Sequence, residues 1–391
     1  MNKIETMRLE IMSEVENHIL PFWMNLKDNE FGGFYGKVDY DLLIDQKANK
    51  GGIATARLLW TFSSAYRVLG KDDYLDAANH VYDFFVKHIL DDVYKGVLWM
   101  VDYKGQSVDD RKHIYAQAFG IYGLSEYYRA TKNSEALELA ISLYRIIEDQ
   151  GYDKVYNIYK EEFTNQWVES NNEMLSENGI IAEATTNTHL HILEAYTNLY
   201  RVWPDEQLRT TLINLVDLFC NKIYKKETKF MKVFYNKNLE EIIDMQSYGH
   251  DIEASWLLDE AIKVLKIEKP NYLDFVKSIA KNINEVAFNP DGSLMNERVD
   301  GQNDCTKVWW VQVEAMVGFY NAYERTGKTT YIESVLKLWN YVGAYMIDER
   351  RDGEWVSGLD QNNIPIKKPI VEPWKTPYHN ARFCLEMIER I

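Results

Sequence analysis

The hydrophobic and polar positions of this chain follow a helical period, and the pattern itself recurs along the sequence. An apolar helical segment ends, turns through polar, glycine or proline residues, and gives way to a second helical segment, as in "AYRVLGKDDYLDAA" from Ala65 and "AYERTGKTTYIESV" from Ala322. Related stretches begin at Tyr127, at Leu199 and, more weakly, at Val264. A helix pair that recurs at a near-constant interval indicates a repeat or ring-shaped helical fold.

The second residue of each copy serves as a marker for the interval. The markers are Tyr66, Tyr128, Tyr200, Leu265 and Tyr323. Their separations are 62, 72, 65 and 58 residues, and a further 66 residues lead to Glu389 in the last predicted helix. The sequence therefore predicts six copies of a helix pair.

The two helices of each pair differ in composition. Those before the marker, such as "YAQAFGIYGLSEYY", are rich in alanine, glycine and aromatic residues, as expected for helices packed on nearly every side. Those after it, such as "YLDAANHVYDFFVKHILDD", carry an apolar stripe and a charged face. Six inner helices ringed by six outer ones describe an all-α (α/α)6 barrel.

Short stretches between an outer helix and the next inner one have the glycines and the alternation of β-hairpins. Examples are "EFGGFYGKVDYD", "YKGVLWMVDYKG" and "DGEWVSGLDQN". These predict hairpin loops at one end of the barrel. Because no linker rich in proline, glycine or serine divides the chain, we expect residues 1–391 to form a single domain.

Charge and composition exclude several classes of partner. The net charge of -16 argues against nucleic-acid binding, which needs clustered lysine and arginine. The three cysteines, Cys220, Cys305 and Cys384, are widely spaced and suggest neither a disulfide framework nor a zinc cage. Acidic and basic residues recur every few positions near the N-terminus, and no uncharged span is long enough to cross a membrane. We expect a cytoplasmic protein, and a monomer.

Polar residues of the inner helices converge at one level of the predicted barrel. Counting nine residues back from each marker gives, in chain order, Arg57, Phe119, His191, Trp256 and Glu314, and ten residues back from Glu389 is His379. Within about two helical turns of this level, on its N-terminal side, lie Tyr115, Asn187, His250, Glu253, Trp309 and Trp310. These side chains should face one mouth of the barrel. A buried histidine alone is usually a hydrogen-bonded core residue, but convergence of three of them with an arginine and two glutamates favours an active site.

Two histidines are candidate proton-transfer groups. His250 and Glu253 are three residues apart and share a helix face, so the Glu253 carboxylate is expected to hold one ring nitrogen of His250. His379 follows Pro377 and should lie in the first turn of the last helix. There the helix dipole and burial both disfavour the imidazolium ion and keep the ring available as a neutral base.

A metal site is the alternative use of these groups. His191, His250, Glu253 and His379 could in principle surround a zinc ion. His189 and His191 point to different sides of a helix, and no paired histidine or cysteine spacing supports a metal site. We therefore expect no metal and no other cofactor.

Tryptophans at the mouth favour a carbohydrate ligand. Trp309, Trp310 and Trp374 flank the polar residues, where an indole face packs on sugar C–H groups while polar neighbours bind hydroxyls. Arg57, Tyr115, Asn187 and Glu314 are suitable hydroxyl partners.

Several motifs together resemble those of the cellobiose 2-epimerases, in the N-acylglucosamine 2-epimerase superfamily. They are "FWMNLKDNEFGGFYG", "LSENGIIAEATTNTHLHILEAYTNLY", "SYGHDIEASWLLDEA", "KVWWVQVEAMVGFYNAY" and "PWKTPYHNARFCLEMI", and the resemblance covers essentially the whole chain. It implies an (α/α)6 barrel that interconverts the reducing-end glucose and mannose of β-1,4-linked disaccharides without metal or nucleotide. The family's paired catalytic histidines match His250 and His379. Its further site residues match Arg57, Asn187, His191, Glu253 and Glu314, and its stacking tryptophans match Trp309 or Trp310, and Trp374.

Such a reaction needs ring opening, removal of the proton at C2 next to the carbonyl, and its return to the opposite face. Two histidines supply a base and an acid, while Arg57 and His191 would stabilise the enediolate oxygens. The expected partner is a disaccharide with a free reducing end. An aldose–ketose isomerase or an epimerase for mannobiose or a monosaccharide remains the nearest alternative. A glycoside hydrolase using Glu253 and Glu314 and a sugar-binding protein without turnover are the more distant ones.

Overall fold

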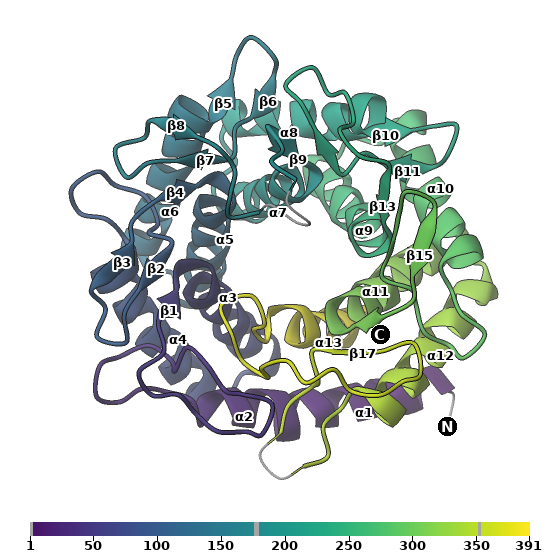
Figure 1. The fold of residues 1–391 in the computed structure, drawn as a ribbon, viewed down its shortest axis with the longest axis horizontal. Helices are drawn as coiled ribbons and strands as arrows, with labels where there is room; N and C mark the ends of the chain where they lie inside the picture. The colour runs from purple at the N-terminus through teal and green to yellow at the C-terminus, as the bar shows by residue number, and fades with distance from the viewer. Residues whose placement is uncertain (1–2, 176–179, 351–352) are drawn as a thin grey trace.

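An inner ring of helices surrounds the centre of the molecule (Figure 1). The computed structural model describes residues 3–175, 180–350 and 353–391. Within these residues the inner helices are α3 (Gly52–Leu69), α5 (Ile114–Thr131), α7 (Thr186–Val202), α9 (Tyr248–Leu265), α11 (Trp309–Thr326) and α13 (Tyr378–Arg390). Each contacts the next in this order, and α13 contacts α3, so that the ring is closed.

An outer layer of helices packs against this ring. It comprises α4 (Asp72–Phe84), α6 (Ser134–Ile146), α8 (Glu206–Leu218), α10 (Pro270–Val286) and α12 (Thr329–Tyr345), each packed on the inner helix before it. The N-terminal helices α1 (Lys3–Glu14) and α2 (Leu20–Met24) complete the layer, with α1 against α12 and α13. Short π-helical turns follow α1, α4, α6 and α8, at Val15–Ile19, Phe85–Ile89, Ile147–Gly151 and Phe219–Ile223.

Small residues and left-handed turns explain how the repeat folds. A Cβ added to Gly123 of α5 would lie 2.6 Å from the Ala56 carbonyl oxygen of α3, so only glycine permits this close approach of two inner helices. At their C-terminal ends, α3 and α11 stop at Gly70 and Gly327. The φ angles of these glycines, 70° and 69°, terminate a helix without the strain that a Cβ would add. The chain can therefore turn within a few residues from an inner helix to its outer partner.

Short antiparallel strands fill the opposite connections, from each outer helix to the next inner one. The strands are β1 (Lys50–Gly51), β2 (Met100–Val101), β3 (Ser107–Asp109), β4 (Lys112–His113), β5 (Tyr152–Asp153), β6 (Ile158–Tyr159), β7 (Glu162–Phe163), β8 (Glu169–Ser170), β9 (Ala184–Thr185), β10 (Tyr224–Lys225), β11 (Phe230–Met231), β12 (Phe234–Tyr235), β13 (Met245–Ser247), β14 (Glu297–Val299), β15 (Gln302–Asp304), β16 (Lys307–Val308) and β17 (Gly358–Leu359). They pair in the orders β1-β2-β3, β4-β7-β8, β5-β6, β12-β9, β10-β11, β13-β14-β15 and β16-β17. Because successive helices alternate in direction, all these strands lie at the end where the inner helices begin.

The predicted predominantly helical fold is confirmed, and the predicted hairpins are confirmed in part. The stretch from Glu30 to Asp41 forms single bridges, Lys27 to Phe34 and Val38 to Ile44, in place of a continuous hairpin. The connection from α6 to α7 contributes strands to three sheets. Residues 176–179 of one resemblance motif, and Asp352 at the start of the last predicted hairpin, lie outside the described residues. Among the described residues, no helix combines the length and the apolar character that a membrane span requires.

Candidate active site

The N-terminal turns of the inner helices bring the predicted site residues together at the strand-bearing end of the ring. Tyr115, Asn187, His250 and Trp310 lie within the first three helical positions of α5, α7, α9 and α11. His379 is the second residue of α13, directly after Tyr378 and the predicted start at Pro377. The count from the repeat markers therefore placed these residues at one level of the ring.

His379 is held by a carboxylate from a neighbouring helix. Its Nδ1 lies 2.7 Å from Oε1 of Glu314 on α11. A carboxylate only accepts hydrogen bonds, so Nδ1 carries the proton and the neutral ring keeps its lone pair on Nε2. The His379 ring is 5.5 Å from the Trp310 ring, centroid to centroid.

His250 has a different partner from the one predicted. Its Nδ1 lies 2.7 Å from Oγ of Ser247, whereas the hydrogen bond described for the Glu253 side chain joins its Oε1 to Nη2 of Arg382, at 2.6 Å. The expected pair of His250 and Glu253 is therefore wrong. Side chains of a helix lean toward its N-terminus, which directs the His250 ring toward Ser247, and the buried guanidinium of Arg382 draws the Glu253 carboxylate away.

The predicted helix-spaced pair of glutamate and histidine exists one helix earlier. Nδ1 of His191 lies 2.8 Å from Oε2 of Glu194, three residues along α7. The His191 ring packs edge-on against Tyr115, whose hydroxyl accepts a hydrogen bond of 2.8 Å from Nη2 of Arg57. The Arg57 guanidinium lies 4.3 Å from the centroid of the Phe119 ring, which fixes its plane beside His191.

Arg382 of α13 connects these groups, although sequence reasoning did not select it. Its Nη2 lies 2.6 Å from Oε1 of Glu253 and 2.6 Å from Oε1 of Glu314. Its Nη1 donates to Glu194 and contacts the hydroxyl of Tyr378, which itself donates to Glu194 at 2.6 Å. One buried guanidinium therefore holds three carboxylates, two of which are the partners of His379 and His191.

Burial sets the protonation of the three histidines. Desolvation lowers the pKa of His250 to about 3 and lowers the pKa of His191, although Glu194 opposes the second shift. Desolvation, together with Arg57 and Arg382, lowers the pKa of His379 well below its usual value. Burial therefore disfavours the imidazolium form of all three rings. Their described hydrogen bonds use Nδ1, which leaves Nε2 for a ligand.

The carboxylates behind the histidines divide into ionised and neutral groups. Burial would raise the pKa of Glu194, but Arg382 and the hydrogen bond from His191 lower it to about 2. Burial and the neighbouring Glu314 raise the pKa of Glu253 well above its usual range. Burial also raises the pKa of Glu314, and the Arg382 guanidinium opposes part of this shift. Because one guanidinium serves both Glu253 and Glu314, we assign the proton to Glu253 and the charge to Glu314, whose Oε1 also holds His379.

A cation site is conceivable among these groups. Ligand atoms of Glu253, Glu314 and His379 lie within 4.8 Å of one another. Nη2 of Arg382 contacts both glutamates, however, so the guanidinium already supplies the positive charge there. His189, whose Nδ1 binds the Thr185 carbonyl oxygen at 2.7 Å, is a structural residue of the core, as its predicted orientation implied.

The three tryptophans and Asn187 lie beside the other predicted site residues. Trp310 contacts both histidines, with ring centroids 4.9 Å from His250 and 5.5 Å from His379. Trp374 packs on Tyr115, and its carbonyl oxygen accepts a hydrogen bond of 3.2 Å from Arg57. Trp309, Trp310 and Trp374 are all half-buried, so each presents part of an indole surface. Asn187 shares a small pocket with His250.

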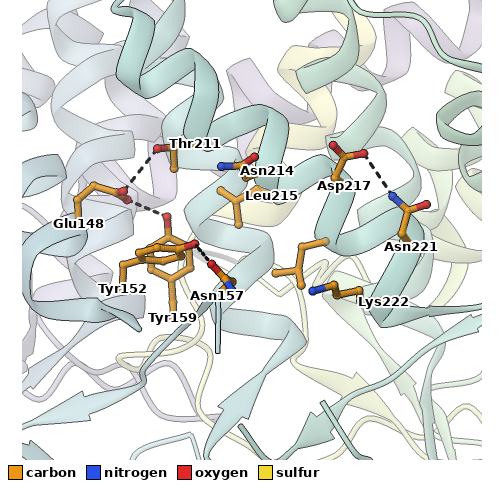
Figure 2. Close-up of a pocket in the computed structure, with 11 residues that line it drawn as sticks. Glu148, Tyr152, Asn157, Tyr159, Thr211, Asn214, Leu215, Asp217, Asn221 and Lys222 are labelled. Atoms are coloured by element: carbon orange, nitrogen blue, oxygen red, sulfur yellow. Dashed lines mark hydrogen bonds between the residues drawn. The ribbon is translucent and has the colours of Figure 1, made fainter. Parts of the chain in front are cut away.

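A larger pocket of about 340 Å³ lies in the outer layer of the molecule (Figure 2). It is lined by residues of α8, of the π-helical turns after α6 and α8, and of the β5-β6 hairpin. One of its two carboxylates, Glu148, accepts hydrogen bonds from the hydroxyls of Tyr159 and Tyr196 at 2.7 and 2.8 Å. None of the predicted site residues lines this pocket, which is distinct from the mouth of the ring.

Three residues of the site were missed by sequence reasoning. Ser247 is the first residue of the motif "SYGHDIEASWLLDEA", Glu194 lies three residues after His191, and Arg382 lies three residues after His379. The same spacing rule that suggested Glu253 would have suggested Glu194. Nothing local in the sequence distinguishes Arg382 from an arginine at the surface.

Comparisons with known proteins show the family to which the chain belongs. A model of the family N-acylglucosamine 2-epimerase (GlcNAc 2-epimerase) matches residues 33–382. The cellobiose 2-epimerase of Dictyoglomus turgidum is 45% identical over 390 residues, which cover 99% of this chain and 100% of that protein. A cellobiose 2-epimerase of Ruminococcus albus is 44% identical, with 97% of this chain and 98% of that protein covered.

Solved structures of related proteins are also similar to this chain. The structure of the cellobiose 2-epimerase from Bacillus thermoamylovorans B4167 superposes with a TM-score of 0.98 at 57% identity, covering 99% of this chain and 100% of that one. A D-mannose isomerase superposes with a TM-score of 0.87 at 21% identity, covering 98% of both chains. The second similarity shows that the fold is shared.

Proposed function

Because the chain belongs to the N-acylglucosamine 2-epimerase family and is a carbohydrate epimerase, we propose that it is a cellobiose 2-epimerase. It would interconvert the reducing-end glucose and mannose of β-1,4-linked disaccharides such as cellobiose and lactose. The catalytic unit would be a single (α/α)6 barrel spanning residues 1–391. The observation that carries the proposal is the pair of buried histidines, His250 and His379, whose rings both contact Trp310 and whose described hydrogen bonds use Nδ1, so that Nε2 of each ring is available.

Epimerisation at C2 needs a base on one face of the sugar and an acid on the other. In the open-chain aldose, one histidine takes the C2 proton on Nε2, and the electron pair forms the C1=C2 bond while the carbonyl oxygen becomes an oxyanion. The other histidine, protonated, returns a proton to the opposite face of C2, and the carbonyl re-forms. After one turnover the first ring is protonated and the second is neutral. This is the state in which the pair can convert the product epimer back.

The cis-enediolate between these steps carries negative charge on oxygen. The Arg57 guanidinium is the donor nearest to that charge in this proposal, and Tyr115 fixes it before substrate arrives. The donor role expected for His191 does not fit, because its Nδ1–H binds Glu194 and Nε2 of the neutral ring can only accept, for example from a sugar hydroxyl. Donors that need no reorganisation during the reaction contribute most to lowering the barrier. The ionised Glu314 stabilises the imidazolium form of His379 when that ring holds the proton.

The remaining mouth residues would bind the disaccharide. Indole surfaces of Trp309, Trp310 and Trp374 suit the C–H faces of two sugar rings, and Asn187 offers an amide whose Oδ1 is buried without a partner among the described residues. The hydrolase alternative is less well supported, because a glycosidase needs two carboxyl groups on either side of the scissile bond. Glu253 and Glu314 are instead buried together on one guanidinium.

The test is incubation with cellobiose, and separately with lactose, in D2O without added metal or nucleotide, followed by NMR. We expect glucosylmannose from cellobiose and epilactose from lactose, each with deuterium at C2. Release of free glucose would instead indicate a hydrolase, and a ketose product would indicate reprotonation at C1. Unchanged disaccharide without deuterium at C2 would contradict the proposal.

Variants test the histidine pair. His250→Ala and His379→Ala should each lose epimerisation by at least a thousandfold with the melting temperature close to that of the wild type. His18→Ala is a matched control, since this histidine lies in the outer layer, where Nδ1 binds Glu14 at 2.7 Å. Substantial activity in either catalytic variant would show that proton transfer uses another group.

A further inference from the structure

The three histidines of the site differ in what holds Nδ1. Carboxylates hold His191 and His379, at 2.8 and 2.7 Å, whereas the hydroxyl of Ser247 holds His250, at 2.7 Å. A carboxylate can only accept a hydrogen bond and carries a charge, while a hydroxyl can donate or accept and carries none. The two proposed proton-transfer histidines are therefore not equivalent.

Ser247 occupies a position where a serine ordinarily has another task. It is the residue before the first turn of α9, with φ -93° and ψ 100°, yet its side chain makes no capping hydrogen bond to the helix. At the start of α7, by contrast, the Thr185 hydroxyl accepts from the Thr188 N–H at 3.1 Å. A serine at this position usually stabilises the helix by capping. Here its hydroxyl binds His250 instead.

The backbone holds Ser247 in place for this contact. It is the last residue of β13, where it pairs with Glu297 of β14, and its side chain is buried. His250 is the third residue of α9, so its ring leans back over the turn that contains Ser247. The strand and the helix thus fix both ends of the hydrogen bond.

Resting on the proposed function, we infer that Ser247 is a positioning residue for His250: its Oγ accepts the Nδ1–H, so that the Nε2 lone pair faces C2 of the sugar. The opposite tautomer, with hydrogen on Nε2, could not take the C2 proton. Because the hydroxyl adds no negative charge, it stabilises the imidazolium form of His250 less than a carboxylate at the same position would.

Three substitutions of Ser247 separate this role from a structural one. Ser247→Ala removes the acceptor, and we expect a fall in kcat of roughly ten- to hundredfold with little change in KM, by analogy with the loss of the partner that orients a metal-bound histidine. The melting temperature should stay at the wild-type value, because no cap is lost. In D2O, exchange of the C2 proton should slow in the epimer that His250 deprotonates and stay close to the wild-type rate in the epimer that His379 deprotonates.

Ser247→Asp replaces the hydroxyl by a carboxylate at the same position. A negative charge next to Nδ1 favours the imidazolium form, so the acid limb of kcat against pH should move to higher pH. The other titratable groups around His250 are His191 from α7, Glu253 from its own helix, Glu314 from α11 and His379 across Trp310, and all of them are unchanged in the variant. Ser247→Thr, which keeps the hydroxyl, should restore most of the activity lost in Ser247→Ala.

The outcomes distinguish this inference from the proposed function. If the wild type fails to exchange deuterium into C2 of cellobiose or lactose, the proposed function is wrong. If the wild type epimerises and Ser247→Ala retains full kcat with exchange in both epimers, the positioning role is wrong. A fall in melting temperature that accounts for the lost activity, without a change in the pH profile of Ser247→Asp, would also overturn it.

Discussion

Replacing Arg382 by methionine tests the buried network that supports the site. The guanidinium is 1% exposed and holds Glu194, Glu253 and Glu314 together. Methionine keeps much of the volume but leaves the carboxylates without a buried cation. Removing one partner of a buried ion pair costs about 3–5 kcal/mol.

The expected fall in melting temperature follows from the size of the chain. At roughly 2.1 cal/mol/K per residue, the 391 residues give an unfolding entropy of about 0.8 kcal/mol/K. A loss of about 4 kcal/mol therefore lowers the melting temperature by about 5 °C at pH 7. Epimerisation should fall as well, because Glu194 and Glu314 would no longer be fixed behind His191 and His379.

Calorimetry and the epimerisation assay measure both effects. Arg201→Met is the control, because Arg201 is 32% exposed and its bridge to Glu260 lies near the surface, where such pairs contribute about 0–1 kcal/mol. The deficit of Arg382→Met should shrink as the pH is lowered toward 5, since the unpaired carboxylates then become protonated. A melting temperature equal to that of the wild type at pH 7 would refute the assignment of Arg382 as the group that stabilises these carboxylates.

Three other substitutions give separable outcomes. The pKa of Glu194 is lowered from 4.5 to about 2 in the folded protein. Its contribution to the free energy of unfolding is therefore present above pH 4.5 and is lost as the pH falls toward 2. In calorimetry, Glu194→Gln should be less stable than the wild type by about 3 kcal/mol at pH 7 and nearly equal to it at pH 2. A Cβ at Gly249 would lie 2.4 Å from Cη2 of Trp310, so Gly249→Ala should cost about 1–3 kcal/mol and displace the indole that contacts both histidines. Gly343→Ala, where an added Cβ meets nothing within 4 Å, is its control and should keep full activity. Trp374→Ala should raise KM for cellobiose about tenfold, a loss of about 1.4 kcal/mol of binding, with a smaller effect on kcat; an unchanged KM would show that Trp374 is not a sugar platform.

The partners of the histidines show where prediction from sequence stopped. Spacing along one helix allows Glu253 to reach His250 and equally allows Glu194 to reach His191, but only the second pair forms. The difference arises because Arg382, 129 residues away in the chain, binds Glu253. Competition between partners on different helices depends on side-chain directions in space, which no local pattern encodes.

What the sequence determined by itself was the helical barrel and the level at which its polar residues meet. Helical period and turn residues act over a few positions, so a repeated pattern places the same turn of every inner helix at the same height, and residues such as Arg57, His191 and His379 were found by counting. Only the tertiary structure decided that α1 closes the outer layer against α13, that Ser247 holds His250, and that Arg382 joins three carboxylates. These contacts join segments distant in sequence, and their stability comes from burial and charge compensation that exist only once the ring has closed.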